Sequence, residues 1–151
     1  MFIDSHCHLD YFPDDKVKKI IERARKNKVV AIISNGTNIE TNRKTLALSE
    51  KFEEIKPALG IYPMEILKLT EEQIESEIKF IKDNKEKIIA IGEVGLDFKE
   101  SEEREKQIKF FRKFIELARQ LNKPIIIHSR KAEKECVEIL EKENVRKVVF
   151  S

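Results

Sequence analysis

The sequence predicts an α/β protein built as a TIM-type (β/α)8 barrel that is incomplete, with about five βα units and a sixth strand. Short apolar runs alternate strictly with longer amphipathic segments, a pattern typical of parallel strands covered by helices. Most unusual polar residues directly follow an apolar run, as in barrels whose chemistry lies at the C-terminal strand ends. A doubly wound open sheet is the alternative, but the first loop lacks the glycine-rich phosphate-binding pattern of that fold.

Length and composition are those of one domain. The 151 residues, 40% of them hydrophobic, suffice for one packed core, and we expect a single domain over residues 1–151. A complete barrel has about 250 residues, so this domain is expected to be the N-terminal portion of a longer barrel. The 30 basic and 28 acidic residues nearly balance, which neither predicts nor excludes a nucleic-acid-binding cleft.

The sequence also bears on cellular location. Two cysteines, Cys7 and Cys136, are too few for a disulfide framework. Asp4, His6 and His8 interrupt the first apolar run, so it does not read as a secretion leader, and no apolar stretch reaches the length of a membrane span. We therefore expect a cytoplasmic protein that does not contact membranes.

The first predicted strand, Phe2–His8, carries two histidines one residue apart. Because side chains alternate along a strand, His6 and His8 point to one face and Cys7 points toward the helices as a small buried hydrophobe. Two imidazoles on one face suit a divalent metal ion, which lowers the pKa of water and gives a hydroxide nucleophile near neutral pH. Asp4 has the same parity and is predicted to orient an imidazole.

The next two βα units contribute mainly structure. A helix over 15–27 precedes the strand Val29–Asn35, and a helix from about residue 38 to 51 follows it, with Thr37 and Glu40 as the predicted capping box. After the strand Ile55–Ile61, Tyr62 is expected to line the cleft, where it stacks on a substrate or closes the barrel mouth. The third helix follows a second predicted capping box, formed by Thr70 and Gln73.

The fourth strand, Ile88–Glu93, ends in a carboxylate. Glu93 shares parity with Ile91, so it is expected to face the same side, and a carboxylate there is costly to bury unless it is paired or bound to metal. A glutamate that reaches solvent or a lysine is the alternative. Asp97 is expected in the following loop as a helix or turn cap, before the long helix at about 102–121.

The fifth strand, Pro124–His128, ends in a histidine in register with Ile126. Arg130 has the same parity and is positioned to contact an anionic substrate group in a bidentate way. A capping histidine and a surface arginine are the alternative interpretation. A helix at about 132–143 and a sixth strand, Lys147–Phe150, complete the alternation.

Taken together, four motifs in this order resemble the TatD-type metal-dependent hydrolases, within the wider group of amidohydrolase-like barrels. The motifs are His6-Cys7-His8-Leu9-Asp10, Gly60-Ile61-Tyr62-Pro63, Gly92-Glu93-Val94-Gly95-Leu96-Asp97 and His128-Ser129-Arg130. The resemblance implies a deoxyribonuclease that uses one or two divalent ions (Mg²⁺, Mn²⁺ or Zn²⁺) on DNA phosphodiester bonds. It implies that His6 and His8 bind one ion, that Glu93 bridges the ions as the catalytic carboxylate, and that His128 binds the second. Arg130 would contact substrate phosphate.

The chain also departs from this family pattern. The family commonly has a histidine where Tyr62 stands, which puts any substrate contact of Tyr62 in doubt. The family's histidine after the sixth strand and aspartate after the eighth would follow Ser151. We therefore expect open sheet edges, covered by a C-terminal half or by self-association, and an inactive truncated form is one interpretation.

Two further interpretations of the function stay open. One is a non-catalytic barrel fragment that needs a partner half. The second is an amidohydrolase that cleaves C–N bonds. Glu93 argues against the amidohydrolase, whose usual bridging group is a modified lysine.

Overall fold

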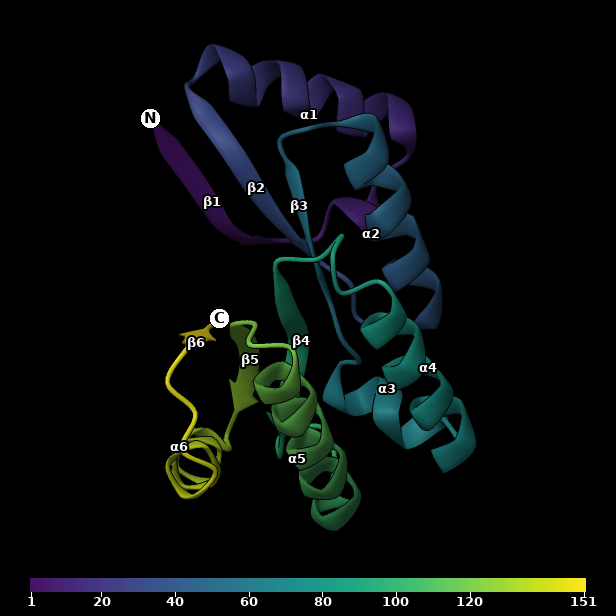
Figure 1. The fold of residues 1–151 in the computed structure, drawn as a ribbon, viewed down its shortest axis with the longest axis vertical. Coiled ribbons are helices and arrows are strands. Elements are labelled where there is room, and N and C mark those ends of the chain that lie inside the picture. Colours follow the sequence, from purple (N-terminus) through teal and green to yellow (C-terminus); the bar gives the residue numbers. More distant parts are fainter.

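The structure, a computed structural model that describes residues 1–151, contains one six-stranded sheet in the order β1-β2-β3-β4-β5-β6. Each strand pairs in parallel with the next, and the sheet curls into an open part of a barrel (Figure 1). The predicted parallel α/β architecture with six strands is confirmed. The strands are β1 (Phe2–Cys7), β2 (Val29–Asn35), β3 (Ile55–Leu59), β4 (Ala90–Asp97), β5 (Ile125–Arg130) and β6 (Val148–Phe150).

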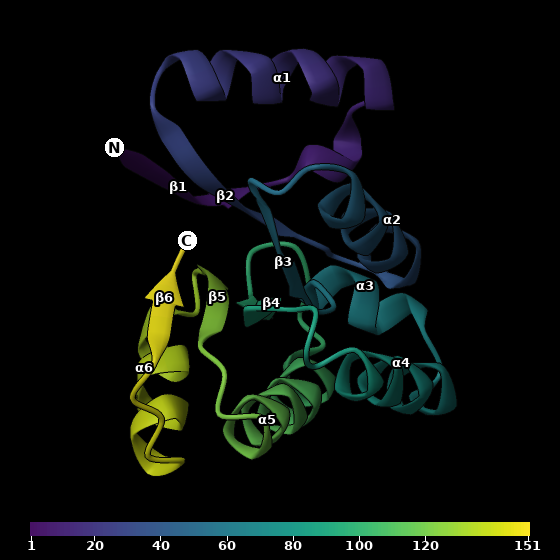
Figure 2. The same ribbon diagram turned by 45° about the horizontal axis from the view of Figure 1, so that its top comes forward.

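The helices lie along the outer side of the curled sheet (Figure 2). Two short ones were not predicted, the 3₁₀ helix η1 (Leu9–Tyr11) and α3 (Pro63–Lys68), because segments of 3 and 6 residues are too short to show a helical period. No helix combines the length and the apolar character needed to cross a membrane. The remaining helices are α1 (Asp14–Lys26), α2 (Ile39–Lys51), α4 (Glu71–Asp83), α5 (Arg104–Gln120) and α6 (Glu133–Lys142).

One predicted capping box is confirmed and the other is wrong. At α4, Thr70 and Gln73 form the reciprocal pair as predicted. At α2 the N-cap is Asn38, whose side chain accepts the Thr41 N–H, while the Thr41 hydroxyl accepts the Asn38 N–H. The prediction placed the box one residue too early, because Asn38 still has an extended backbone with φ −154°.

The main core lies between the sheet and the helices. Ile91, Val94 and Leu96 of β4 pack in it together with Phe110 and Phe114 of α5, all of them buried. The strands that carry the candidate site are therefore held on their helix side by an extensive apolar layer.

The two edge strands differ from this layer, since β1 pairs only with β2 and β6 pairs only with β5. On β1, Phe2 is 65% and Ile3 is 64% exposed, and Val149 and Phe150 of β6 are exposed as well. Large apolar side chains and unpaired backbone groups thus lie along both edges. Edges of this kind are suited to pairing with further strands.

Strand β4 corrects the parity argument for Glu93. The strand extends to Asp97, and its pairing with β5 shifts register between Ile91 and Val94. Ile91 and Val94 both pack in the helix-side core, whereas Glu93 faces the histidines on the inner side of the sheet. Shared parity with Ile91 was thus the wrong reason for an inward Glu93, because the register shift turns Glu93 away from the helices.

Candidate metal centre

Strand β1 and the residue that follows it bring two imidazoles together. The Nε2 atoms of His6 and His8 lie 3.2 Å apart. The Nδ1 atom of His8 is 2.9 Å from the carbonyl oxygen of Asn35 at the end of β2. Because a carbonyl oxygen only accepts hydrogen bonds, Nδ1 of His8 carries a proton there, which leaves Nε2 as the lone-pair nitrogen of the neutral ring. The lone pair of His8 is therefore presented to His6 and Glu93.

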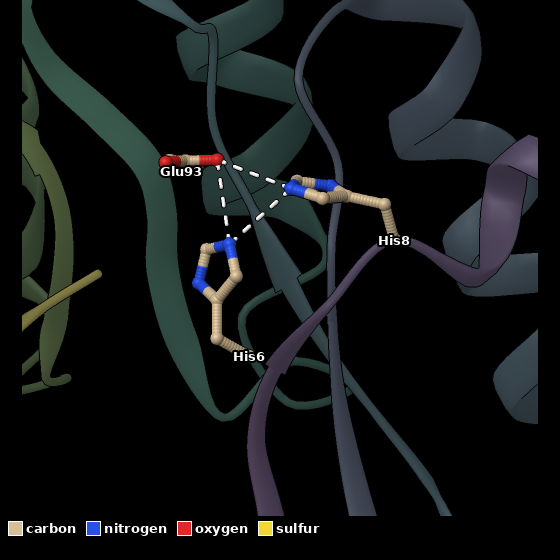
Figure 3. Close-up of side chains that lie close together, drawn as sticks. All are labelled: His6, His8 and Glu93. Atoms are coloured by element: carbon tan, nitrogen blue, oxygen red, sulfur yellow. Dashed lines mark hydrogen bonds and ion pairs between the residues drawn. The ribbon is translucent and has the colours of Figure 1, made fainter.

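Glu93 lies between these rings and His128. Its Oε2 atom is 3.6 Å from Nε2 of His6 and 3.3 Å from Nε2 of His8. Dashed lines in Figure 3 mark both contacts. Its other oxygen, Oε1, is 3.3 Å from Nδ1 of His128. One ligand atom from each of His6, His8 and Glu93 lies within 4.8 Å of the others, so two nitrogens and one carboxylate oxygen are grouped as a divalent metal ion requires.

His128 is held on its other side by two residues from neighbouring strand ends. Its Nε2 atom is 3.2 Å from Oδ2 of Asp97 and 3.3 Å from the hydroxyl of Tyr62. The Tyr62 hydroxyl itself donates to Oδ2 of Asp97 at 2.8 Å, and the Tyr62 and His128 rings pack edge to face with centroids 4.7 Å apart. The Tyr62 hydroxyl is thus engaged within the site.

Asp97 was predicted only as a cap, and the structure gives it two roles. Oδ1 accepts the backbone N–H groups of Lys99 and Glu100, as a turn cap does. Oδ2 reaches Tyr62 and His128, a contact that the sequence did not predict. A signal was present, since Asp97 stands two residues after Gly95 at the end of an apolar run. Gly95 has φ +142°, and a Cβ there would lie 2.0 Å from the His128 carbonyl oxygen, so only glycine permits this close approach.

The electrostatics follow from this grouping. Burial opposes the charged form of Glu93, but its hydrogen bonds with His128, His6 and His8 outweigh burial and lower its pKa. The hydrogen bond to Glu93 raises the pKa of His8. For His128, burial acts against the charged ring, yet the interactions with Glu93 and then Asp97 raise its pKa. Without metal, the buried Glu93 carboxylate therefore favours the protonated forms of His8 and His128.

Three other residues singled out in the sequence lie away from this grouping. Asp4 accepts the backbone N–H of His6 at 3.1 Å, so the prediction that it orients an imidazole ring is wrong. Arg130 ends β5 at the exposed surface, where its guanidinium is 2.7 Å from Glu100. Cys7 packs against the small apolar cluster beneath α1, on the predicted side of the strand, but it is only partly buried.

A cavity of about 490 Å³ adjoins the centre. Tyr11, which the sequence motifs did not single out, stacks on His8 with ring centroids 5.1 Å apart. Tyr62 lines the cavity as predicted. The lining residues are His6, His8, Tyr11, Thr37, Asn38, Tyr62, Glu65, Glu93 and His128.

Comparison with known proteins decides the family. The model of the TatD related DNase family matches residues 3–150, nearly the entire chain. The chain belongs to the TatD family. The resemblance drawn from the four sequence motifs is thereby confirmed.

Individual TatD relatives give the same result. An uncharacterized metal-dependent hydrolase of Methanocaldococcus jannaschii is 36% identical over 139 residues, 91% of this chain and 54% of that protein. Human deoxyribonuclease TATDN3 is 31% identical over 161 residues, 98% of this chain and 59% of that protein. The crystal structure of YjjV, a TatD homologue of Escherichia coli, superposes with a TM-score of 0.85 at 29% identity, over 95% of this chain and 56% of that chain. The chain thus spans a little over half the length of these relatives.

Proposed function

We propose that this chain forms the metal-binding part of a divalent-metal-dependent hydrolase that cleaves phosphodiester bonds of DNA. The observation that carries the proposal is Glu93, whose two carboxylate oxygens face different histidines, the His6–His8 pair on one side and His128 on the other. Such an arrangement suits one ion or two ions that share a carboxylate. DNA as the substrate is supported by the name of the human relative, a deoxyribonuclease.

The proposed ligands form two sets. His6, His8 and Oε2 of Glu93 would hold one ion, and Oε1 of Glu93 with Nδ1 of His128 would hold a second. A bound divalent ion lowers the pKa of water and neutralises developing charge on phosphoryl oxygens. Asn35 keeps a proton on Nδ1 of His8, so that the Nε2 lone pair remains directed at the site. Mg²⁺, Mn²⁺ and Zn²⁺ are the candidates for this donor set.

Two residues are proposed to contact the substrate. Arg130 lies two residues beyond His128, and its exposed guanidinium is free to exchange Glu100 for a phosphate group. Tyr62 lines the cavity, and because its hydroxyl donates to Asp97, its ring face is the part left for a nucleotide. Arg130→Ala should therefore raise KM for DNA more than it lowers kcat.

We also propose that activity requires both sheet edges to be covered by further strands. Support comes from the exposed Phe2 and Ile3 on β1 and from Val149 and Phe150 on β6. The test is DNA cleavage and Zn²⁺ retention by the 151-residue chain, alone and co-expressed with the C-terminal half of the Escherichia coli homologue. A stimulation that needs the added half supports the proposal, and full activity of the chain as a monomer contradicts it.

The decisive experiment on function is metal-dependent DNA cleavage. It uses the chain with its edges covered, with Mg²⁺, Mn²⁺ or Zn²⁺ and then with EDTA. Glu93→Ala should abolish cleavage, whereas Glu86→Ala, at an exposed glutamate shortly before the same strand, should leave it unchanged. Cleavage that survives EDTA would rule out the metal-dependent mechanism. Turnover of small amides or cyclic ureas without DNA cleavage would favour C–N bond hydrolysis instead.

A further inference from the structure

We propose that Asp97 is a positioning residue that orients the His128 ring, so that Nδ1 faces Glu93 and the ion beside it while Nε2 faces Asp97. The inference deepens the proposed function and rests on it for the presence of the ion. It assigns a role to a buried carboxylate that none of the proposed ligand sets uses. Its basis is the contact of one Asp97 oxygen with Nε2 of His128 at 3.2 Å.

Asp97 is itself held in place from several directions. Its side chain is fully buried, with 0% exposure. Two backbone N–H groups, from Lys99 at 3.0 Å and Glu100 at 3.1 Å, donate to Oδ1. The Gln107 side chain accepts the Asp97 N–H at 2.7 Å and donates to the Asp97 carbonyl at 3.0 Å. Backbone and carboxylate are therefore fixed before any ion binds, as preorganised support for a ligand requires.

The contacts of His128 fix which nitrogen would remain for an ion. The Tyr62 hydroxyl donates its proton to Oδ2 of Asp97 at 2.8 Å, so both oxygens near Nε2 of His128 are available only as acceptors. With an ion beside Glu93, Nε2 would keep its proton and donate it to Asp97, and Nδ1 would supply the lone pair. Nδ1 is the nitrogen that lies 3.3 Å from Oε1 of Glu93. Asp97 and Glu93 thus lie at opposite nitrogens of one ring, the arrangement in which a carboxylate orients a metal-binding histidine.

Backbone geometry limits how else the ring can be placed. Gly95 on β4 lies so close to His128 on β5 that a Cβ at Gly95 would be 2.0 Å from the His128 carbonyl oxygen. The Tyr62 ring packs edge to face with the imidazole at an interplanar angle of 68°. The backbone position of His128 is thus set by β4, and its ring rotation by Tyr62 and Asp97.

Nuclear magnetic resonance and metal titration test this inference together. The chain has only 3 histidines, so ¹⁵N-histidine labelling and long-range ¹H–¹⁵N spectra resolve the protonated nitrogen of each ring in the Zn²⁺-loaded protein. Wild type should have the proton on Nε2 of His128. Asp97→Asn should bind Zn²⁺ about 10–100-fold more weakly, because the carboxylate that holds the ring is lost. Tyr62→Phe should keep the Nε2–H tautomer, because the Asp97 carboxylate remains.

Glu77→Gln is the matched control, since it also converts a buried carboxylate to an amide but at α4, among Asn42 and Arg43. It should leave both the tautomer and the Zn²⁺ affinity unchanged even if it lowers the melting temperature. A proton on Nδ1 of His128 in Zn²⁺-loaded wild type, or an Asp97→Asn variant with the Zn²⁺ affinity of wild type, would overturn the inference. If wild type binds no Zn²⁺, the proposed function fails, whereas Zn²⁺ binding that Asp97→Asn leaves unchanged refutes the role of Asp97 alone.

Discussion

Replacing Glu77 with alanine should lower the free energy of unfolding by about 3 kcal/mol. Glu77 lies on α4 with a side chain that is only 2% exposed. Its oxygens are 2.5 and 2.6 Å from Nη1 of Arg43, and Oε1 accepts a hydrogen bond from Asn42 at 2.8 Å. Asn42 also bonds both the N–H and the C=O of Gly60. One carboxylate therefore joins α4, α2 and the loop that carries Tyr62.

The magnitude follows from what each partner loses. A hydrogen bond to a charged group contributes about 1.5–3 kcal/mol, but the Arg43 side chain is 43% exposed and regains water when Glu77 is truncated. We therefore count about 1 kcal/mol for the arginine. The fully buried Asn42 amide loses an acceptor that water cannot replace, which costs about 1–2 kcal/mol, and the cavity adds to this. Glu77→Gln keeps an oxygen for Asn42 and should cost roughly half as much.

Urea denaturation of wild type, Glu77→Ala, Arg43→Ala and the double variant measures these terms. Glu72→Ala, at an exposed glutamate on the same helix, is the control and should change stability by less than about 0.5 kcal/mol. The double-mutant cycle should give a coupling of about 1 kcal/mol between Glu77 and Arg43. A Glu77→Ala loss below about 1 kcal/mol would refute the argument that this carboxylate connects the three segments.

Three further results are expected. Phe114→Ala, at the centre of the main core, should lower the free energy of unfolding by about 3–5 kcal/mol in the same assay, and a smaller loss would mean that the core closes around the cavity. Thr70→Ala removes the N-cap of α4 and should cost about 1 kcal/mol, whereas Thr70→Ser should restore most of it. The hydrogen bond to Glu93 raises the pKa of His8 in the folded, metal-free protein. The protonated His8 therefore stabilises the fold at pH values below the ordinary histidine pKa, and this stabilisation is lost as pH rises through the raised pKa. The melting temperature in EDTA should therefore fall over that range, and His8→Gln should reduce the fall.

The alternating pattern was enough to predict the sheet because its strands, above all the buried β3 and β4, read as apolar runs. It was not enough to predict which side Glu93 faces. Parity arguments assume regular pairing, and the register shift between Ile91 and Val94 breaks that assumption through contacts with β5 that lie far away in sequence. Glu93 was selected as a carboxylate that is costly to bury unless it is paired or bound to metal, and the structure pairs it with histidines. The geometric reason given for its direction was wrong.

Asp97 shows a second limit of sequence reasoning. Its bonds to Lys99 and Glu100 are local, and a turn cap is what local patterns predict. Its bond to Tyr62 spans 35 positions and that to His128 spans 31, so these contacts exist only once β3, β4 and β5 lie side by side. The long-range partners of such a buried carboxylate cannot be predicted from any short window of sequence.

The histidine pair lies at the end of the edge strand β1, and contacts with β2 and α2 hold the chain at that end. Exposure along β1 is high at its N-terminal end and falls toward Cys7. Beyond that point the chain is tied down, since Leu9 N–H donates to the Ser34 hydroxyl and the Lys44 ammonium donates to the carbonyl oxygens of Asp10 and Phe12. The exposed end of β1 is thus the end without ligands. The position of the His8 imidazole therefore depends on contacts with β2 and α2 within the same sheet and helix layer.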